Sequence, residues 1–176
     1  MEKNRHRDGR FVKGAESFEQ TWRRRFEERA LSYNDEAAVA GWSKNGLEGR
    51  FRRFRGLWKT HGQMGLWMDA GCGAGTYTRY LSACGCETIG MDYSRPSVER
   101  ARLMSDPSIT WCVGDVRRIP VSPGSADGVV CFGVMQALAD PRAAVAQLVL
   151  ITRPGGQIWI DGLNRWCLPT LVREGV

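Results

Sequence analysis

The heptapeptide DAGCGAG at residues 69–75 constrains the fold of this chain more than any other stretch of the sequence. Its three glycines stand at alternate positions, directly after the short apolar run 65–68. Because glycine has no Cβ, the backbone there can take positive φ and a ligand can lie directly against the peptide groups. The segment 76–84 that follows has its apolar side chains on one helical face. The pattern predicts a strand, a glycine loop that holds a ligand, and a helix.

Downstream of this loop, short apolar runs alternate with helical patterns, which is typical of βαβ units and a parallel sheet. The predicted strands are 66–70, 88–92, 109–113, 128–132 and 157–161, and the predicted helices are 76–84, 96–104 and 142–152. Pro96 suits a helix start after Ser94, and the RPGG turn at 153–156 is expected to stop the last helix before the fifth strand. We expect an α/β fold, a Rossmann-like doubly wound, mostly parallel sheet of about five strands with helices on both faces.

The segment ahead of the loop is predicted to be helical and basic. Residues 1–60 carry 15 Lys or Arg against 9 Asp or Glu, whereas residues 61–176 carry 10 of each. The first dozen residues resemble a flexible tail, and 16–31 has an apolar helical stripe. A second helical region, 35–59, is expected to be broken by Gly41 and Gly46. We therefore divide the chain into a basic cap segment, 1–60, and a core, 61–176.

Aromatic residues alternate with arginines in the second helical region, between Trp42 and Trp58. Such a pattern can stack on bases, but it is equally typical of an amphipathic helix that packs on a sheet. Charged runs usually form a solvated face, and no nucleic-acid-binding motif accompanies this one. The sequence therefore disfavours a nucleic acid as the partner.

Composition excludes several other classes. The chain has no run of roughly 18 apolar residues, and its polar start, MEKNRHRDGR, does not resemble a secretory signal, so we expect a cytoplasmic protein without a membrane span. Its six cysteines include no CxxC pair, and His6 and His61 are its two histidines. No metal site is predicted, and the cysteines are expected to be reduced thiols.

Acidic residues follow three of the predicted strands, at the edge where open parallel sheets bind ligands. Asp69, Asp92 and Asp115 end the first, second and third strands, and Phe132 and Gly133 end the fourth. Asp92 follows the first loop glycine by 21 residues, the separation at which an acid typically meets a ribose hydroxyl pair. Asp115 could accept a hydrogen bond from the exocyclic amino group of a purine. Each carboxylate could instead cap a helix or a turn.

With these motifs, residues 65–161 resemble the class I S-adenosylmethionine-dependent methyltransferases, in particular small-molecule enzymes related to the ubiquinone and menaquinone C-methyltransferases. The resemblance rests on the segments DAGCGAG, IGMDYS, VGDVRRIP, CFGVMQALADP and RPGG. It implies S-adenosyl-L-methionine as cofactor and a small-molecule acceptor. No protein nucleophile is needed for in-line methyl transfer, and no catalytic residue is identified.

The resemblance also implies roles for individual residues. Gly71 and Gly73 would lie against the methionine part of the cofactor, whose amino group Asp69 would help to fix. Asp92 would bind the ribose, with Tyr93 beside the adenine, and Phe132 and Gly133 would lie near the methyl-bearing sulfur. The implied cofactor-binding set is Asp69, Gly71, Cys72, Gly73, Gly75, Asp92, Tyr93, Asp115, Val116, Phe132 and Gly133.

Two further residues are weighed as contributors to the site. His61 could act as a general base, although a capping or buried histidine explains it as well. Tyr33 resembles the amino-terminal tyrosine region that covers the cofactor in this family. The fourth strand ends in CFGVMQ, which lacks the proline-and-aromatic tetrapeptide of enzymes that methylate nucleobase or glutamine amino groups.

The main competing nucleotide class is the nicotinamide dinucleotide enzymes, whose fingerprint is GxGxxG. Here the third glycine is Gly75 and position 76 is Thr, so the spacing is GxGxG. No lysine follows Lys59, which removes the TyrxxxLys pair of short-chain dehydrogenases, and no GxxxxGK marks a P-loop. The glycine spacing therefore disfavours a dehydrogenase.

The family normally has seven strands, and the last two are missing from this pattern. The remaining segment, LNRWCLPTLVREGV, resembles the start of another helix, so the fifth strand would be an apolar sheet edge. Truncation of a longer product is the first explanation, and a homodimer through this edge is the second. A non-catalytic cofactor-binding module and an RNA methyltransferase remain as alternatives to the small-molecule enzyme.

Overall fold

The computed structural model describes residues 17–162. The predicted tail over the first dozen residues and the predicted helix start in LNRWCLPTLVREGV lie outside this part of the chain. Among the described residues, no helix is long and apolar enough to cross a membrane.

Five parallel strands of the described chain form one sheet in the order β3-β2-β1-β4-β5. The strands are β1 (Leu66–Ala70), β2 (Glu87–Asp92), β3 (Thr110–Val113), β4 (Ala126–Cys131) and β5 (Thr152–Ile160). The first strand, β1, lies at the centre of the sheet, and β2 and β3 are added on one side of it. The chain then crosses back and adds β4 and β5 on the other side, so the sheet is doubly wound. The predicted α/β fold is confirmed.

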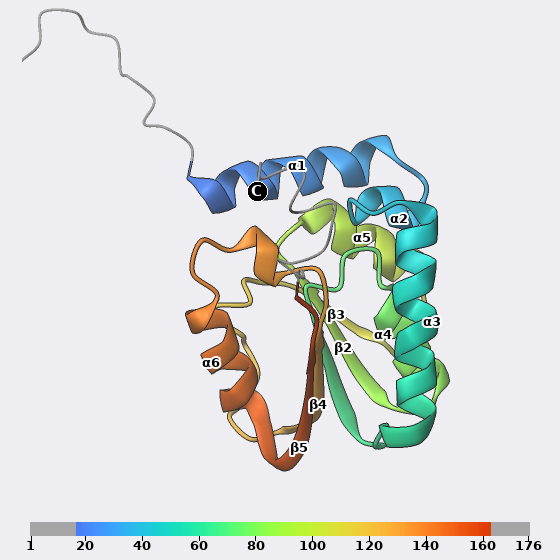
Figure 1. Ribbon diagram of the computed structural model, residues 1–176, viewed down its shortest axis with the longest axis vertical. Helices are drawn as coiled ribbons and strands as arrows, with labels where there is room; N and C mark the ends of the chain where they lie inside the picture. The colour runs from blue at the N-terminus through green and yellow to red at the C-terminus, as the bar shows by residue number, and fades with distance from the viewer. Residues whose placement is uncertain (1–16, 163–176) are drawn as a thin grey trace, which may run out of the picture.

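Helices cover both faces of the sheet, and one lies across its end (Figure 1). The helix α6 lies on one face, α3, α4 and α5 lie on the other, and α1 crosses the carboxyl ends of the strands. The bounds are α1 (Phe18–Ser32), α2 (Glu36–Val39), α3 (Lys44–His61), α4 (Thr76–Ala83), α5 (Arg95–Leu103), the 3₁₀ helix η1 (Met135–Ala137) and α6 (Arg142–Ile151).

The predicted break between α2 and α3 occurs at one of the two expected glycines. Gly41 has φ +77° and lies between the helices, where a side chain would be strained. The prediction for Gly46 is wrong, because this residue lies in the first turn of α3. Its backbone N–H donates to Ser43 Oγ at 3.1 Å, so the serine caps the helix there.

The RPGG stretch was expected to separate the last helix from the fifth strand, and this expectation is wrong. The helix α6 ends at Ile151 and β5 begins at Thr152. Thr152 pairs with Ala126 and Gln157 pairs with Gly128, so the residues between them form an irregularity within β5. The segment is therefore a bulge of the edge strand instead of a turn ahead of it.

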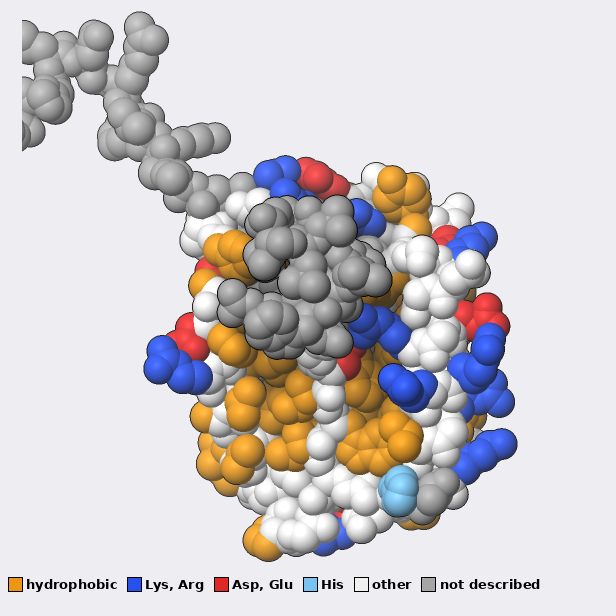
Figure 2. All heavy atoms as spheres, in the orientation of Figure 1, with side chains coloured by type: hydrophobic (Ala, Val, Ile, Leu, Met, Phe, Trp, Pro, Cys, Tyr) orange, Lys and Arg blue, Asp and Glu red, His pale blue; other side chains and the backbone are white. Residues whose placement is uncertain are grey.

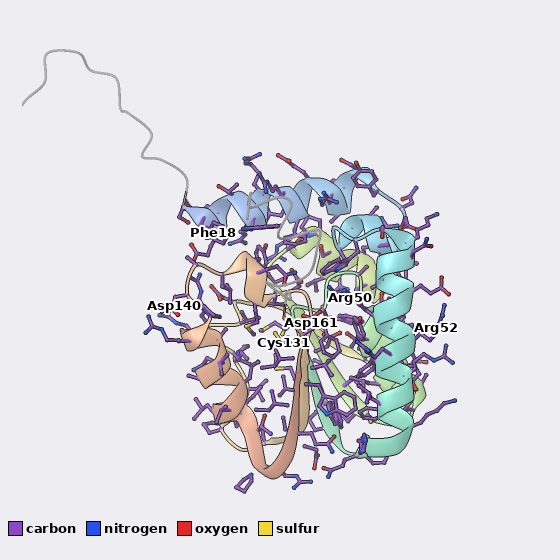
Figure 3. All side chains as sticks on the ribbon, in the orientation of Figure 1. Phe18, Arg50, Arg52, Cys131, Asp140 and Asp161 are labelled. Atoms are coloured by element: carbon purple, nitrogen blue, oxygen red, sulfur yellow. The ribbon has the colours of Figure 1, made fainter. Side chains whose placement is uncertain are left out.

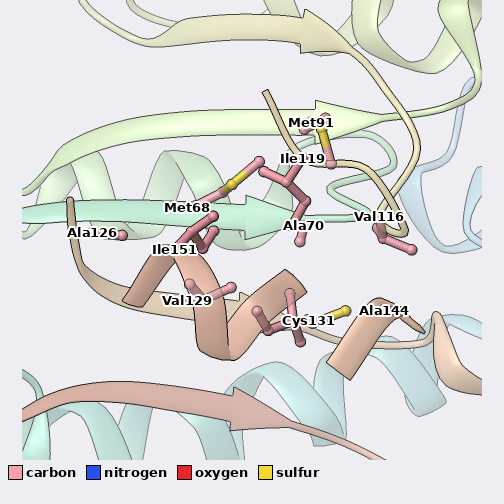
Figure 4. Packing of buried hydrophobic residues seen from close by; sticks show 11 residues of the cluster. Met68, Ala70, Met91, Val116, Ile119, Ala126, Val129, Cys131, Ala144 and Ile151 are labelled. Atoms are coloured by element: carbon pink, nitrogen blue, oxygen red, sulfur yellow. The ribbon is translucent and has the colours of Figure 1, made fainter. Parts of the chain in front are cut away.

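The core consists of two layers, one on each face of the sheet. The layer under α6 is aliphatic and sulfur-rich, with Met68, Met91, Val129, Cys131 and Ile151 among its buried members (Figure 4). The side chains of this layer need no hydrogen-bond partners, because they carry no strong hydrogen-bonding groups.

The layer under α3 and α4 is aromatic. Phe54 of α3 is 3% exposed. The centroid of its ring lies 5.2 to 5.7 Å from the ring centroids of Tyr77, Tyr80, Phe132 and Trp159. Edge-to-face contacts between rings at these separations stabilise the fold beyond the effect of burying the rings. The aromatic side chains of this helix therefore pack on the sheet, whereas Arg52, Arg53 and Arg55 are exposed.

The outer edge of β5 is bordered by apolar side chains. Figure 2 shows hydrophobic atoms gathered over β5 and the neighbouring α6. The exposed fractions of Val149 and Ile160 are 59% and 41%. The apolar edge predicted for the fifth strand is present in the described chain.

Candidate cofactor site

A cavity of about 450 Å³ lies at the carboxyl ends of the strands, beneath α1. Its volume is in the range of pockets that bind small molecules. Eight of the residues predicted for the site line it: Gly71, Gly73, Asp92, Tyr93, Asp115, Val116, Phe132 and Gly133. The structure thus brings together residues from four strand ends.

The glycine loop bends under the cavity as its sequence predicts. Gly71, Gly73 and Gly75 have φ of +88°, +52° and +84°, values that L side chains rarely adopt. The backbone N–H groups of Gly71 and Cys72 donate to Met91 O at 2.7 and 2.9 Å, which ties the loop to the end of β2. A Cβ at Gly73 would have no atom within 4 Å, so the backbone there is open to a ligand.

Asp92 connects the glycine loop to the start of α5. Its Oδ2 accepts from the Gly73 N–H at 3.0 Å, and its Oδ1 accepts from the Ser94 N–H at 2.8 Å. Burial raises the pKa of Asp92, and these backbone donors oppose that effect. The carboxylate is therefore held at the cavity wall with lone pairs left for a ligand.

Three predicted residues, Asp69, Cys72 and Gly75, do not line the cavity. Asp69 is 2% exposed, its Oδ2 accepts from Thr78 Oγ1 at 2.6 Å, and burial raises its pKa to about 7. Cys72 is buried, and a Cβ at Gly75 would stand 2.5 Å from Trp111 Cη2. These three residues therefore face the protein interior and not the cavity.

Asp115 has a partner that the sequence reasoning missed. Its carboxylate accepts from Arg117 Nη2 at 2.7 Å and from Arg117 Nε at 3.1 and 3.2 Å. This hydrogen-bonded guanidinium lowers the pKa of Asp115. Arg117 also lines the cavity, so the end of β3 presents an ion pair where a lone carboxylate was expected.

The N-terminal helix supplies a wall that no motif indicated. Its lining residues are Ser17, Glu19, Gln20, Arg23 and Phe26. Phe26 meets the ring of Tyr93 edge to face, with centroids 6.3 Å apart, and the Arg23 guanidinium carbon lies 5.8 Å from the same ring. The apolar stripe of this helix predicted its amphipathic character, but no local signal shows which part of the sheet it covers.

A tryptophan on the loop before α3 also went unpredicted. Trp42 lines the cavity, and a Cβ at Gly133 would stand 3.2 Å from its Cζ2. The Arg50 guanidinium carbon lies 4.0 Å from the Trp42 ring centroid, and Arg50 forms an ion pair with Asp161 (Figure 3). Asp161 Oδ1 also accepts from the Gly133 N–H at 2.6 Å, so α3 and the ends of β4 and β5 share one network.

The two other candidates lie away from this cavity. His61 is exposed at the end of α3, and its backbone carbonyl accepts from Gln157 Nε2 at 2.7 Å. Tyr33 lines a second, neighbouring cavity, and its carbonyl accepts from Arg100 Nη1 at 2.8 Å. Phe26 lines the first cavity and Tyr33 does not, so the structure does not place Tyr33 at this cavity.

Comparison with known proteins agrees with this geometry. A family described as "Methyltransferase domain" matches residues 68–160. A ubiquinone biosynthesis O-methyltransferase of Idiomarina loihiensis is 30% identical over 117 residues, which cover 62% of this chain and 48% of the relative. An uncharacterised 37.1 kDa protein in transposon TN4556 of Streptomyces fradiae is 35% identical over 97 residues, 52% of this chain and 28% of the relative. The chain spans less than half the length of these relatives.

Solved structures share the fold. A chain from a complex described as that of the Haloferax volcanii Trm112 methyltransferase activator and "the putative methyltransferase" aligns with TM-score 0.63 and 23% identity, over 77% of this chain and 58% of that one. A Methanococcus maripaludis protein described as a putative S-adenosylmethionine-dependent methyltransferase aligns with TM-score 0.60 and 19% identity, over 92% and 67%.

Proposed function

The chain belongs to the methyltransferase domain family, whose cofactor is S-adenosylmethionine, and on this basis we propose that it methylates a small-molecule acceptor. The similarity to ubiquinone biosynthesis O-methyltransferases supports an acceptor of that size. The observation that carries the proposal is the cavity at the strand ends, where the open backbone of Gly73 adjoins the buried carboxylate of Asp92.

The cavity suits the cofactor in size and in chemistry. Its volume of about 450 Å³ fits a nucleoside joined to an amino acid. The lone pairs of Asp92 suit a ribose hydroxyl pair, and the ring of Tyr93 suits the neighbouring adenine. We assign the methionine part to the bare backbone of Gly71 and Gly73.

The remaining lining residues receive roles by position. We assign Val116 and the Asp115–Arg117 pair to the adenine side, and Phe132 and Gly133 to the sulfur. Asp69, Cys72 and Gly75 do not line the cavity, and the contact of Asp69 with the cofactor amino group stays a prediction.

When bound, S-adenosylmethionine supplies an electrophilic methyl group, so an acceptor lone pair can bond to that carbon while the carbon–sulfur electron pair moves to sulfur. The protein's part is to orient the two reactants and exclude water, which can contribute roughly 7 to 11 kcal/mol. Among the described residues, the carboxylates at the cavity already accept hydrogen bonds from backbone groups or from Arg117. We therefore assign none of them as a general base and attribute catalysis to positioning.

Calorimetric titration with S-adenosylmethionine and S-adenosylhomocysteine tests the proposal. We expect both ligands to bind the unmutated protein, and Asp92→Ala to weaken binding by about tenfold or more, because a buried hydrogen bond to a charged group is lost. Asp92→Asn should fall between the two, because the amide keeps one acceptor oxygen. Asp140→Ala removes an exposed carboxylate that pairs with Arg142 outside the cavity and should bind normally (Figure 3).

The outcomes separate the parts of the proposal. If neither ligand binds the unmutated protein, the assignment of the cavity is wrong. If Asp92→Ala binds as tightly as Asp140→Ala, the role of Asp92 is wrong. Tight binding without turnover on a broad panel of small-molecule acceptors would indicate a non-catalytic module.

A further inference from the structure

A second cavity of about 630 Å³ opens beneath α1, on the other side of a wall that it shares with the first. The residues common to both cavities are Phe26, Ala40 and Trp42. The second cavity is also lined by Trp22, Arg25, Glu28, Arg29, Ser32, Tyr33, Gly41 and Gln136. Of the residues that line the second cavity, only the three shared residues also line the proposed cofactor site. The function of the rest of the second cavity is therefore unassigned.

Flat rings dominate the apolar part of this cavity. Trp22 and Phe26 lie stacked on successive turns of α1, with centroids 5.6 Å apart and an interplanar angle of 26°. Trp42 and Tyr33 add two more rings, and Tyr33 is 49% exposed. Walls of this kind favour a planar aromatic ligand, because ring faces and edges pack best on other rings.

The charged part of the cavity is cationic. The Arg25 guanidinium carbon lies 5.4 Å from the Trp22 ring centroid, and no carboxylate among residues 17–162 pairs with Arg25. Arg29 donates through Nη1 to Ala38 O at 3.0 Å, which leaves its other N–H groups available. Glu28 is the acid of the cavity, and it forms an ion pair with Arg24 at 3.1 Å. A guanidinium beside a ring favours a carboxylate attached to an aromatic group.

The shared wall lies at the end of β4. Trp42 packs beside Gly133, which lines the first cavity. Gln136 lines the second cavity and donates from Nε2 to the carbonyl oxygen of Gly133 at 2.8 Å. Arg50 and Asp161 hold Trp42 and Gly133 in one network (Figure 3). Two residues that line the second cavity, Trp42 and Gln136, thus contact Gly133, which is assigned to the methyl-bearing sulfur.

We propose that the second cavity binds a planar aromatic carboxylate beside the cavity assigned to the cofactor. The binding of such an anion can be measured independently of methyl transfer. The ring would lie among Trp22, Phe26 and Trp42, and the carboxylate would pair with Arg25.

Three probes of similar size separate the two requirements. 2-Naphthoate has the aromatic ring and the charge, 2-naphthamide has the aromatic ring alone, and decahydro-2-naphthoate has the charge on a saturated skeleton of the same carbon number. Each is titrated by calorimetry and by saturation-transfer NMR into the protein alone and into the protein saturated with S-adenosylhomocysteine. We expect 2-naphthoate to bind about tenfold more tightly than either of the others, because each of them lacks one of the two contacts.

Two charge variants locate the anion. Arg25→Gln should weaken 2-naphthoate about tenfold and leave 2-naphthamide unchanged, because only the charged contact is removed. Arg52→Gln removes the same charge from the outer face of α3, where Arg52 pairs with Glu48, and should bind both probes normally (Figure 3). S-adenosylmethionine should bind both variants as it binds the unmutated protein.

The proposal is overturned if no probe binds, if the acid and the amide bind equally, or if Arg52→Gln loses as much affinity as Arg25→Gln. Failure of S-adenosylmethionine to bind the unmutated protein would instead refute the proposed function. In that case the probe titrations without cofactor still decide whether the cavity recognises an aromatic carboxylate.

Discussion

At the scale of single residues, several glycines act by leaving room for tryptophan rings. A Cβ at Gly128 would stand 2.3 Å from Trp67 Cζ2, and one at Gly90 would stand 2.3 Å from Trp111 Cζ3. Trp67 is fully buried, and its Nε1 donates to Gln63 O at 2.8 Å, so the ring cannot move aside easily. These glycines are needed for packing and not for unusual backbone angles.

The first prediction compares two glycine substitutions. Gly128→Ala should lower the free energy of unfolding by about 1 to 3 kcal/mol, because the added methyl overpacks the core against Trp67. Gly49→Ala, in the middle of α3 with nothing within 4 Å of the added Cβ, should raise it by roughly 0.5 to 1 kcal/mol through helix propensity. Urea unfolding measures both. Equal effects would contradict the packing argument.

A second prediction concerns Asp69, whose pKa burial raises to about 7. Between about pH 4 and pH 7 the folded state then binds more protons at this residue than the unfolded state, so the free energy of unfolding falls as pH rises. Asp69→Asn should reduce this fall by about 1 to 3 kcal/mol, because an amide does not titrate. Urea unfolding across that pH range measures the difference, and Asp140→Asn is the exposed control. Parallel pH profiles for Asp69→Asn and the unmutated protein would contradict the prediction.

At the scale of secondary-structure elements, α1 is attached near both ends. Near its start, Glu19 Oε1 accepts from the Ala139 N–H at 3.2 Å and lies 3.7 Å from Arg117 Nη1. Near its end, Arg100 of α5 donates to the carbonyl oxygens of Tyr33 and Asn34 at 2.8 and 2.7 Å. The helix therefore spans the cavity between two anchors.

The third prediction removes the first anchor. Glu19→Ala should speed amide hydrogen exchange in the first turns of α1 several-fold and raise the dissociation rate of S-adenosylhomocysteine, because local opening becomes easier. Exchange in β1 and β4 should stay unchanged, since these strands do not contact Glu19. Glu99→Ala on α5, where the Arg95 contact is 4.0 Å long, is the control. Unchanged exchange in α1 would show that Glu19 is not an anchor.

At the scale of the whole molecule, ion pairs moderate the basic charge of the N-terminal segment. Arg23, Arg24 and Arg52 form i,i+4 pairs with Glu27, Glu28 and Glu48. Arg50 is paired with Asp161. Such pairs contribute little to stability, but they place a negative charge beside each of these four arginines. The surface is therefore less suited to a phosphate backbone than the count of arginines suggests.

The fourth prediction tests the RNA methyltransferase alternative. Binding of a single-stranded RNA should be weak, and its logarithmic salt dependence should have a slope shallower than about −2 between roughly 50 and 200 mM salt, because few phosphates are neutralised. Fluorescence anisotropy of a labelled RNA measures this slope. A slope steeper than about −5, corresponding to many phosphate contacts, would favour RNA as the substrate.

The local features of this protein follow from its sequence by itself. The strand, glycine loop and helix around Gly71 and Gly73, and the start of α5 after Asp92, were predicted where the structure has them. Turn chemistry, capping and hydrophobic periodicity act within a few residues, so one segment carries the whole signal. The same reasoning failed at two places. At Gly46, the Ser43 cap keeps the glycine within the first turn of α3, and at RPGG, pairing with β4 includes the glycines in β5 where a turn was expected.

Only the tertiary structure decided what surrounds the loop. The placement of α1 over the strand ends, the contact of Arg117 with Glu19, and the position of Trp42 as a shared wall have no local signature. Arg50 and Asp161 meet although 111 residues separate them. Such contacts depend on how whole elements pack, and an amphipathic pattern specifies that a face is buried without specifying its partner.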